Sequence, residues 1–232
     1  MDLAVIRSRD AVVRTRTNLI NHVRGMVKSF GGRISKCSAE AFCSRALEEM
    51  PEELRPTLWA VVKTIADLSR QIRNYDKQIE AMAEQRYPEV KILRQISGVG
   101  VLTALTYVLV LEDPHRFKKS RSVGAYLGLR PRLKQSGQSD RQLRITKAGD
   151  KLLRRLLVGS GQYILGPLGP DCDLRRWGLA LAARGGKNAK KRAAVAVARK
   201  LSVLLHRLWM TGEEYEPFRV AHQEAVMGNL NG

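Results

Sequence analysis

The sequence predicts a mainly helical, all-α protein of 232 residues. Hydrophobic residues make up 44% of the chain while aromatic residues reach only 6%, and this mixture of Ala, Leu, Val and Ile with Arg favours helices over a β-sandwich or barrel. Apolar residues also recur at helical spacing in several separate segments. The chain is long enough for one large domain or two small ones, each with a buried core.

Residues 1–56 are expected to form a helical N-terminal segment. Apolar residues at helical spacing predict one helix over residues 3–30, ended by two glycines. A second, short helix is expected from Ser38, as the N-cap, to Met50, because a proline follows directly. Neither helix carries residues with recognisable chemistry.

Residues 57–88 are expected to form one long coiled-coil helix. Its apolar residues alternate in spacings of three and four, which is the heptad pattern of a coiled coil. The stripe consists of Leu58, Val61, Ile65, Leu68, Ile72, Tyr75, Ile79 and Met82. It could pair with a second chain, or it could pack against the N-terminal helices, since both arrangements produce the same stripe.

Residues 89–212 are expected to form a third, helix-hairpin-helix domain, followed by a frayed tail over residues 213–232. Two apolar helical segments flank Ser97, Gly98 and Gly100. The glycines let the backbone turn tightly, and the amides at the start of the second helix can then face a phosphate with the helix dipole behind them. The alternative is an ordinary glycine-containing turn in a core.

The charge of the chain is strongly positive and concentrated after residue 88. The 41 Lys and Arg against 22 Asp and Glu give a net charge of +19, of which +4 falls in residues 1–88 and +15 beyond them. Such an excess favours a polyanion as partner. The candidate nucleic-acid contacts, besides the glycine turn, are Arg116, Lys118, Lys119, Arg121, Arg132, Lys134, Arg141, Arg144, Lys147, Lys187, Lys190, Lys191 and Arg192.

Several other classes of protein are disfavoured. The longest apolar run covers about 13 residues, fewer than the roughly 20 that a bilayer-spanning helix needs. The first ten residues contain charges and lack the apolar block of a secretory signal, so we expect a cytoplasmic protein without a membrane partner. Three cysteines without paired short spacing predict neither a disulfide framework nor a metal site.

The runs ISGVG, RFKKSRSVGAYLGLRPR and KQSGQSDRQLRITKAGDKLLRRLLV, in this order over about residues 92–165, resemble the C-terminal domain of the DEDD-type insertion-sequence transposases. Some members of that family are guided by a bridge RNA, and the family places a coiled coil just upstream. The resemblance implies DNA as the partner, with a structured RNA as a further one. It carries the family's nucleophilic serine to Ser136, with Ser139 as the competing candidate.

The resemblance also implies an N-terminal ribonuclease-H-like domain whose carboxylates bind a divalent metal such as Mg²⁺. That domain is apparently missing, so we expect no cofactor in this chain and no strand transfer by the chain alone. The first hypothesis is therefore a truncated transposase. The alternative is a non-catalytic nucleic-acid-binding regulator, which would pair with full-length transposase, or with itself as a homo-oligomer, through residues 58–82. A decayed gene fragment is a third option.

Overall fold

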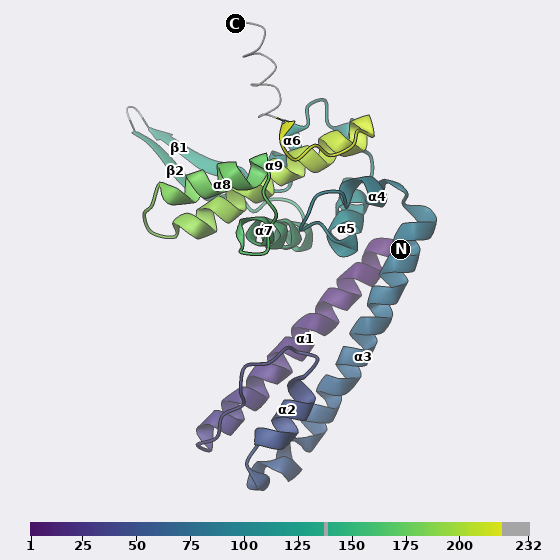
Figure 1. Ribbon diagram of the computed structural model, residues 1–232, viewed down its shortest axis with the longest axis vertical. Coiled ribbons are helices and arrows are strands. Elements are labelled where there is room, and N and C mark those ends of the chain that lie inside the picture. The colour runs from purple at the N-terminus through teal and green to yellow at the C-terminus, as the bar shows by residue number, and fades with distance from the viewer. Residues whose placement is uncertain (137–138, 220–232) are drawn as a thin grey trace, which may run out of the picture. The chain divides into compact units, whose positions relative to one another are not determined.

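The computed structural model describes residues 1–136 and 139–219, with side chains for all of these except residues 133–142. The prediction of a mainly all-α protein is confirmed: the described part of the chain consists of helices and one two-stranded sheet. The chain divides into two compact units, one of residues Met1–Met82 and one from Ala83 onward, and the division falls inside the long helix α3 (Figure 1).

The first unit is built on two long helices that lie side by side, α1 (Asp2–Ser29) and α3 (Arg55–Arg86) (Figure 1). The short helix α2 (Phe42–Glu49) lies between them in the chain, and a 3₁₀ turn (Glu52–Leu54) precedes α3. Helix α2 begins later than predicted, because the Ser38 hydroxyl accepts the N–H of Ala41 in a turn before the helix.

Polar contacts hold α1 to α3. The buried Arg16 of α1 donates from Nη1 to the Ser69 hydroxyl of α3 and to a carboxylate oxygen of Glu40, both at 3.2 Å. Nearer the start of α1, Nε of Arg9 lies 2.5 Å from Oδ1 of Asp76. These contacts fix how far α1 can slide along α3.

The heptad stripe of α3 is buried within this unit. Its three isoleucines are at most 5% exposed. At the end of the helix near Leu58 and Ile65, the stripe packs in one cluster with Val23 of α1 and Phe42 of α2. Packing inside the chain therefore accounts for this part of the stripe, and pairing of residues 58–82 with a second chain stays a prediction.

The second unit is organised around its last helix. Its elements are α4 (Glu89–Leu93), α5 (Val101–Leu111), a 3₁₀ turn (Pro114–Arg116), α6 (Arg121–Tyr126), β1 (Pro131–Ser136), β2 (Ser139–Ile145), α7 (Lys151–Leu165), α8 (Asp173–Ala183) and α9 (Ala189–Thr211). Helix α9 contacts α6, α7 and α8 (Figure 1). Its inner face, with Val197, Leu201 and Leu205, is fully buried.

Close packing against α9 requires a glycine. A Cβ added to Gly161 of α7 would lie 2.6 Å from the carbonyl oxygen of Ala194, closer than real Cβ contacts occur. A Cβ on Gly178 of α8 would likewise come within 2.5 Å of the Val197 side chain. Both neighbouring helices thus approach α9 at a distance that a larger residue would not allow.

Two buried polar groups tie earlier segments to α9. The Tyr107 hydroxyl of α5 donates to the carbonyl of Ser202 at 2.6 Å, and burial raises the pKa of this phenol well above its usual value. The buried His206 ring lies 2.8 Å from the Pro114 carbonyl through Nε2 and 3.0 Å from the Ser120 hydroxyl through Nδ1. Because a carbonyl only accepts, Nε2 carries a proton, and His206 fixes the start of α6.

Strands β1 and β2 form an antiparallel hairpin. The basic, glycine-bearing sequence of residues 130–148 is compatible with either an exposed loop or a hairpin. Its base is fixed by backbone bonds, including the N–H of Lys147 to the carbonyl of Gly128 at 3.0 Å. Arg154 of α7 donates from Nη1 to the carbonyls of Leu127 and Ala148 at 3.1 and 2.7 Å. The hairpin therefore starts from a well-defined point on the helices.

No helix within residues 1–136 and 139–219 combines the length and the apolar character needed to cross a membrane. The strongly apolar α5 contains only 11 residues.

We predict that Ile65→Ala destabilises the first unit by about 2–5 kcal/mol, the usual cost of a buried Ile-to-Ala cavity. Urea unfolding followed by far-UV circular dichroism measures the change. Arg73→Ala, at an exposed position of the same helix, should stay within about 0.5 kcal/mol of the unchanged chain. Equal losses for the two variants would contradict the packing described for α3.

Candidate nucleic-acid interface

The glycine turn joins α4 to α5 in a conformation that only glycine adopts readily. Gly98 has φ +89°, outside the regions open to residues with a Cβ. The N–H of Val99 closes the turn on the carbonyl of Ile96 at 3.0 Å. Gly100 then has extended backbone as the N-cap of α5, so the predicted position of the turn agrees with the structure.

The first turn of α5 presents backbone N–H groups without a side-chain cap. The N-cap of this helix is Gly100, which has no side chain to accept from them. The first amides of any helix lack intrahelical acceptors, and the helix dipole places partial positive charge at the same end. A negatively charged group is the natural partner for such an end.

A hollow of about 560 Å³ lies beside this turn. One wall is the turn itself, and the other is formed by α7 with Gly159, Ser160 and Tyr163. Two arginines line the hollow, Arg94 from the end of α4 and Arg155 from α7. The turn amides, a hydroxyl and two guanidinium groups therefore face one space, and this is a set of donors suited to a phosphate.

The sequence singled out Ser97, Gly98 and Gly100 but missed Arg94 and Arg155. All five line the same hollow. Arg94 lies three residues before Ser97, so its distance from the motif could have identified it. Arg155 reaches the site from α7, and only the packing of α7 against α5 brings it there.

The cations of residues 116–121 form a separate group. Arg116 donates to the Leu111 carbonyl at 3.1 Å and lies 5.8 Å from the ring centre of Tyr126. Lys118, Lys119 and Arg121 are exposed. None of the four lines the hollow at the glycine turn, so the structure does not bring this group together with the turn.

The hairpin carries the serine singled out by the sequence. Ser136 pairs with Ser139, and Lys134 pairs with Arg141 two rungs nearer the base. The backbone of these four residues is described, but their side chains lie outside the described part of the structure. Arg132 donates to the Thr146 carbonyl at 3.3 Å, and Arg144 is exposed.

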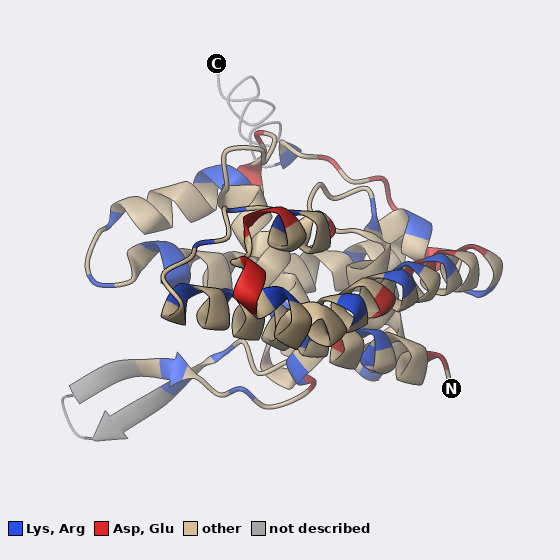
Figure 2. Cartoon of the chain, turned by 90° about the horizontal axis from the view of Figure 1, so that it is seen from below, with Lys and Arg blue, Asp and Glu red and all other residues tan. Residues whose placement is uncertain are grey.

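A second and larger hollow, of about 1450 Å³, runs along the outer face of α9; we call it the α9 groove. It brings Arg144 and Lys147 from the hairpin together with Lys191 and Arg192 from the start of α9. Figure 2 shows lysines and arginines at the base of the hairpin and on the helices. Lys187 and Lys190 are exposed close by in the chain but do not line the groove.

The chain strains its backbone where α9 begins. Gly185 and Gly186 have φ of +76° and +87°, and the non-glycine Asn188 has φ +64°. Nη2 of Arg192 reaches back to the Gly185 carbonyl at 3.1 Å. This tight turn precedes Lys191 and Arg192, which line the α9 groove.

The described residues do not offer a metal site. Across residues 1–136 and 139–219, no three His, Cys, Asp or Glu side chains gather so that they could hold a metal ion. Cys37, Cys43 and Cys172 are free thiols, and burial raises the pKa of the Cys43 thiol.

Comparisons with known proteins agree with this architecture. Residues 90–164 match the model of the transposase IS116/IS110/IS902 family. Over 91% of its length the chain is 30% identical to a transposase for insertion sequence element IS1111A of Coxiella burnetii, of which it covers 59%. Over 92% of its length it is 32% identical to a putative transposase, y4pF/y4sB, of Sinorhizobium fredii, of which it covers 56%.

A probable family 20 transposase of Pseudomonas aeruginosa is 28% identical over 91% of the chain, which covers 64% of that protein. The chain thus spans between half and two thirds of the length of these relatives. The matches relate the chain to the insertion-sequence transposase class. More narrowly, the part that matches the IS116/IS110/IS902 family model includes the glycine turn, the hairpin and most of α7.

We predict that Gly98→Ala destabilises the second unit by about 1–3 kcal/mol, the usual cost of placing a Cβ in such a conformation. The added Cβ would also lie 2.8 Å from Cδ1 of Tyr163. Gly100→Ala is the matched control, because φ is −82° there and nothing lies within 4 Å of its Cβ position. Thermal unfolding of both variants measures the difference, and equal melting temperatures would refute the account of the turn.

Proposed function

We propose that this chain acts in insertion-sequence transposition by binding DNA through its second unit, with a backbone phosphate held in the hollow at the glycine turn. The observation that supports it is the convergence of the uncapped end of α5, Arg94 and Arg155 on one space. Backbone amides and arginines recognise phosphate without reading bases. We place this activity in the cytoplasm, where bacterial DNA lies.

The charge of the chain supports the same proposal over a longer range. The excess of +15 after residue 88 attracts a polyanion and raises the rate of encounter. The exposed cations of residues 116–121 and 187–190 would add contacts to neighbouring phosphates. A structured RNA, implied by the family resemblance, carries the same phosphate chemistry and is proposed as a second partner on these grounds alone.

We further propose Ser136 as the catalytic nucleophile. Its hydroxyl would attack the phosphorus of a DNA strand, forming a bond from Oγ to phosphorus while the bond from phosphorus to one strand oxygen breaks. The proton of the hydroxyl would pass to the departing oxygen.

The register of the hairpin supports this role. Residues two apart on a strand share a face and lie about 7 Å apart, so the Lys134–Arg141 rung shares a face with the Ser136–Ser139 rung. Cations at this distance can stabilise the charge that develops on the phosphate oxygens. Arg132 and Arg144 follow nearer the base of the hairpin.

We predict that Arg94→Gln with Arg155→Gln weakens binding of a fluorescein-labelled DNA duplex about tenfold or more, because two charge-assisted contacts to phosphate are lost. Fluorescence anisotropy at several salt concentrations measures this, and the salt slope should fall by about two.

Arg176→Gln, together with Arg70→Gln, is the control with the same change in net charge. Arg176 pairs with Asp171 and Arg70 with Asp67, and neither lines the hollow. Binding of duplex DNA that does not change with salt would contradict the proposed function.

We predict that, with Mg²⁺ and the ribonuclease-H-like domain of a full-length relative supplied, the chain forms a covalent adduct with a duplex carrying an element end, and that Ser136→Ala abolishes it. The adduct is detected as a slower band on a denaturing gel. Ser139→Ala is the matched control on the opposing strand and should retain the adduct. If only Ser139→Ala abolished the adduct, Ser139 and not Ser136 would be identified as the nucleophile.

A further inference from the structure

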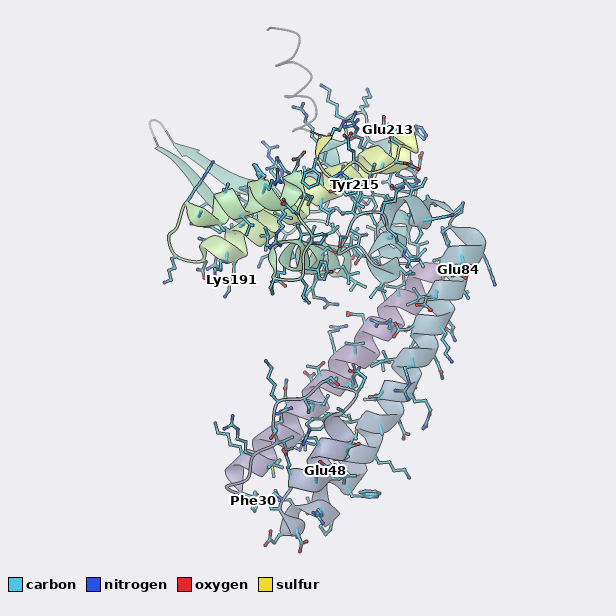
Figure 3. The ribbon with its side chains drawn as sticks, viewed as in Figure 1. Phe30, Glu48, Glu84, Lys191, Glu213 and Tyr215 are labelled. Carbon is cyan, nitrogen blue, oxygen red and sulfur yellow. The ribbon has the colours of Figure 1, made fainter. Side chains whose placement is uncertain are left out.

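The α9 groove has a cationic rim with few carboxylates. Nine lysines and arginines line it against three acids, Asp173, Glu214 and Glu216. The basic residues are Arg144, Lys147, Arg184, Lys191, Arg192, Arg199, Lys200, Arg207 and Arg219. Figure 3 labels Lys191 near the start of α9, and Glu213 and Tyr215 beyond its end. The cations therefore dominate the part of the groove where α9 begins.

Most of these cations, including Lys191, Arg199 and Lys200, have no carboxylate partner within the part of the chain that the structure describes. By contrast, Arg207 and Arg219 both pair with Glu213, at 3.1 Å. Lys200 is exposed, and partial desolvation of its ammonium group lowers its pKa. A nearby anion would favour the charged form of this group.

The floor of the groove is apolar. It is formed by the outer side of α9, with Val195, Val203 and Leu204, and by Leu181 of α8 and Leu143 of β2. Leu143 is 47% exposed. A contiguous apolar surface of this kind inside a ring of charge marks a binding site in a water-soluble protein.

One aromatic ring stands at the groove beside an unpaired cation. Trp177 of α8 is partly exposed, and Nζ of Lys200 lies 3.9 Å from the centre of its ring. At this point a flat apolar ring therefore lies next to a positive charge, and this pair matches the base and the phosphate of one nucleotide.

The α9 groove is large enough to hold the rings of several nucleotide bases. Pockets of about 300–1,000 Å³ hold one drug-sized molecule, and the α9 groove measures about 1450 Å³. A DNA duplex has its bases stacked inside and offers only phosphates, sugars and base edges to a protein surface. It could meet the rim of the groove, but it could not fill the apolar floor.

We propose that the α9 groove binds an unpaired DNA strand, with its bases on the apolar floor and Trp177, and its phosphates at Lys191, Arg199 and Lys200. This inference rests on the proposed function for the nature of the polyanion, but it concerns a different site from the glycine turn. DNA is favoured over RNA because the apolar floor offers little to satisfy the 2′-hydroxyls of RNA.

The test measures binding of fluorescein-labelled oligo(dT) to the full chain by anisotropy. Trp177→Ala and Val203→Asp should each weaken oligo(dT) binding about tenfold, since stacking on one aromatic ring contributes about 1–3 kcal/mol per base. Trp177→Phe should keep most of the affinity. Arg176→Gln is the control, because Arg176 precedes Trp177 on α8 but does not line the groove.

Duplex binding to the same variants separates this proposal from the proposed function. We expect the groove variants to leave duplex affinity within about twofold, which also shows that they are folded, and the Arg94 and Arg155 variants to leave oligo(dT) affinity unchanged. If the chain bound oligo(dT) but no duplex, this result would contradict the proposed function and would still support single-strand binding in the α9 groove. Equal losses of duplex and oligo(dT), no loss with Trp177→Ala, or tighter binding of oligo(U) than of oligo(dT) would overturn the proposal.

Discussion

The close contact of α7 with α9 is the constraint on which the second unit depends. Because Gly161 has no side chain, α7 can lie against the backbone of α9 at Ala194. The position of α7 then sets Arg155 and Tyr163 at the glycine turn, and Arg154 at the base of the hairpin. One helix crossing therefore positions both the hollow at the glycine turn and the strand pair that carries Ser136.

The outer face of α9 differs from the inner face in its packing and its charge. Its inner face is packed, while its outer face leaves Val203 and Leu204 beside Arg199 and Lys200. Repulsion between like charges along one helix opposes folding, and a nucleic acid would relieve it. The same helix thus provides hydrophobic stability on one side and affinity for polyanions on the other.

Local patterns in the sequence predicted much of this fold. The glycine turn and the stripe of α3 both follow from residues close together in the chain. What the sequence could not predict depends on packing over long distances: Arg155 reaches the glycine turn from another helix, and Lys200 covers the ring of Trp177, 23 residues earlier in the chain. The stripe of α3 also has the same spacing whether α1 or a second chain covers it, so periodicity alone could not identify the partner.

The hairpin places Ser136 at the end of an arm. Ser136 lies five residues after Pro131, the first residue of β1, and this spacing corresponds to about 17 Å at the usual rise per residue. Within the described residues the arm is a ribbon of only two strands, and its register shifts between Pro131 and Leu133. A slip of one further residue would turn Ser136 to the other face of the ribbon. The irregularity near the base therefore determines which face of the arm carries residue 136.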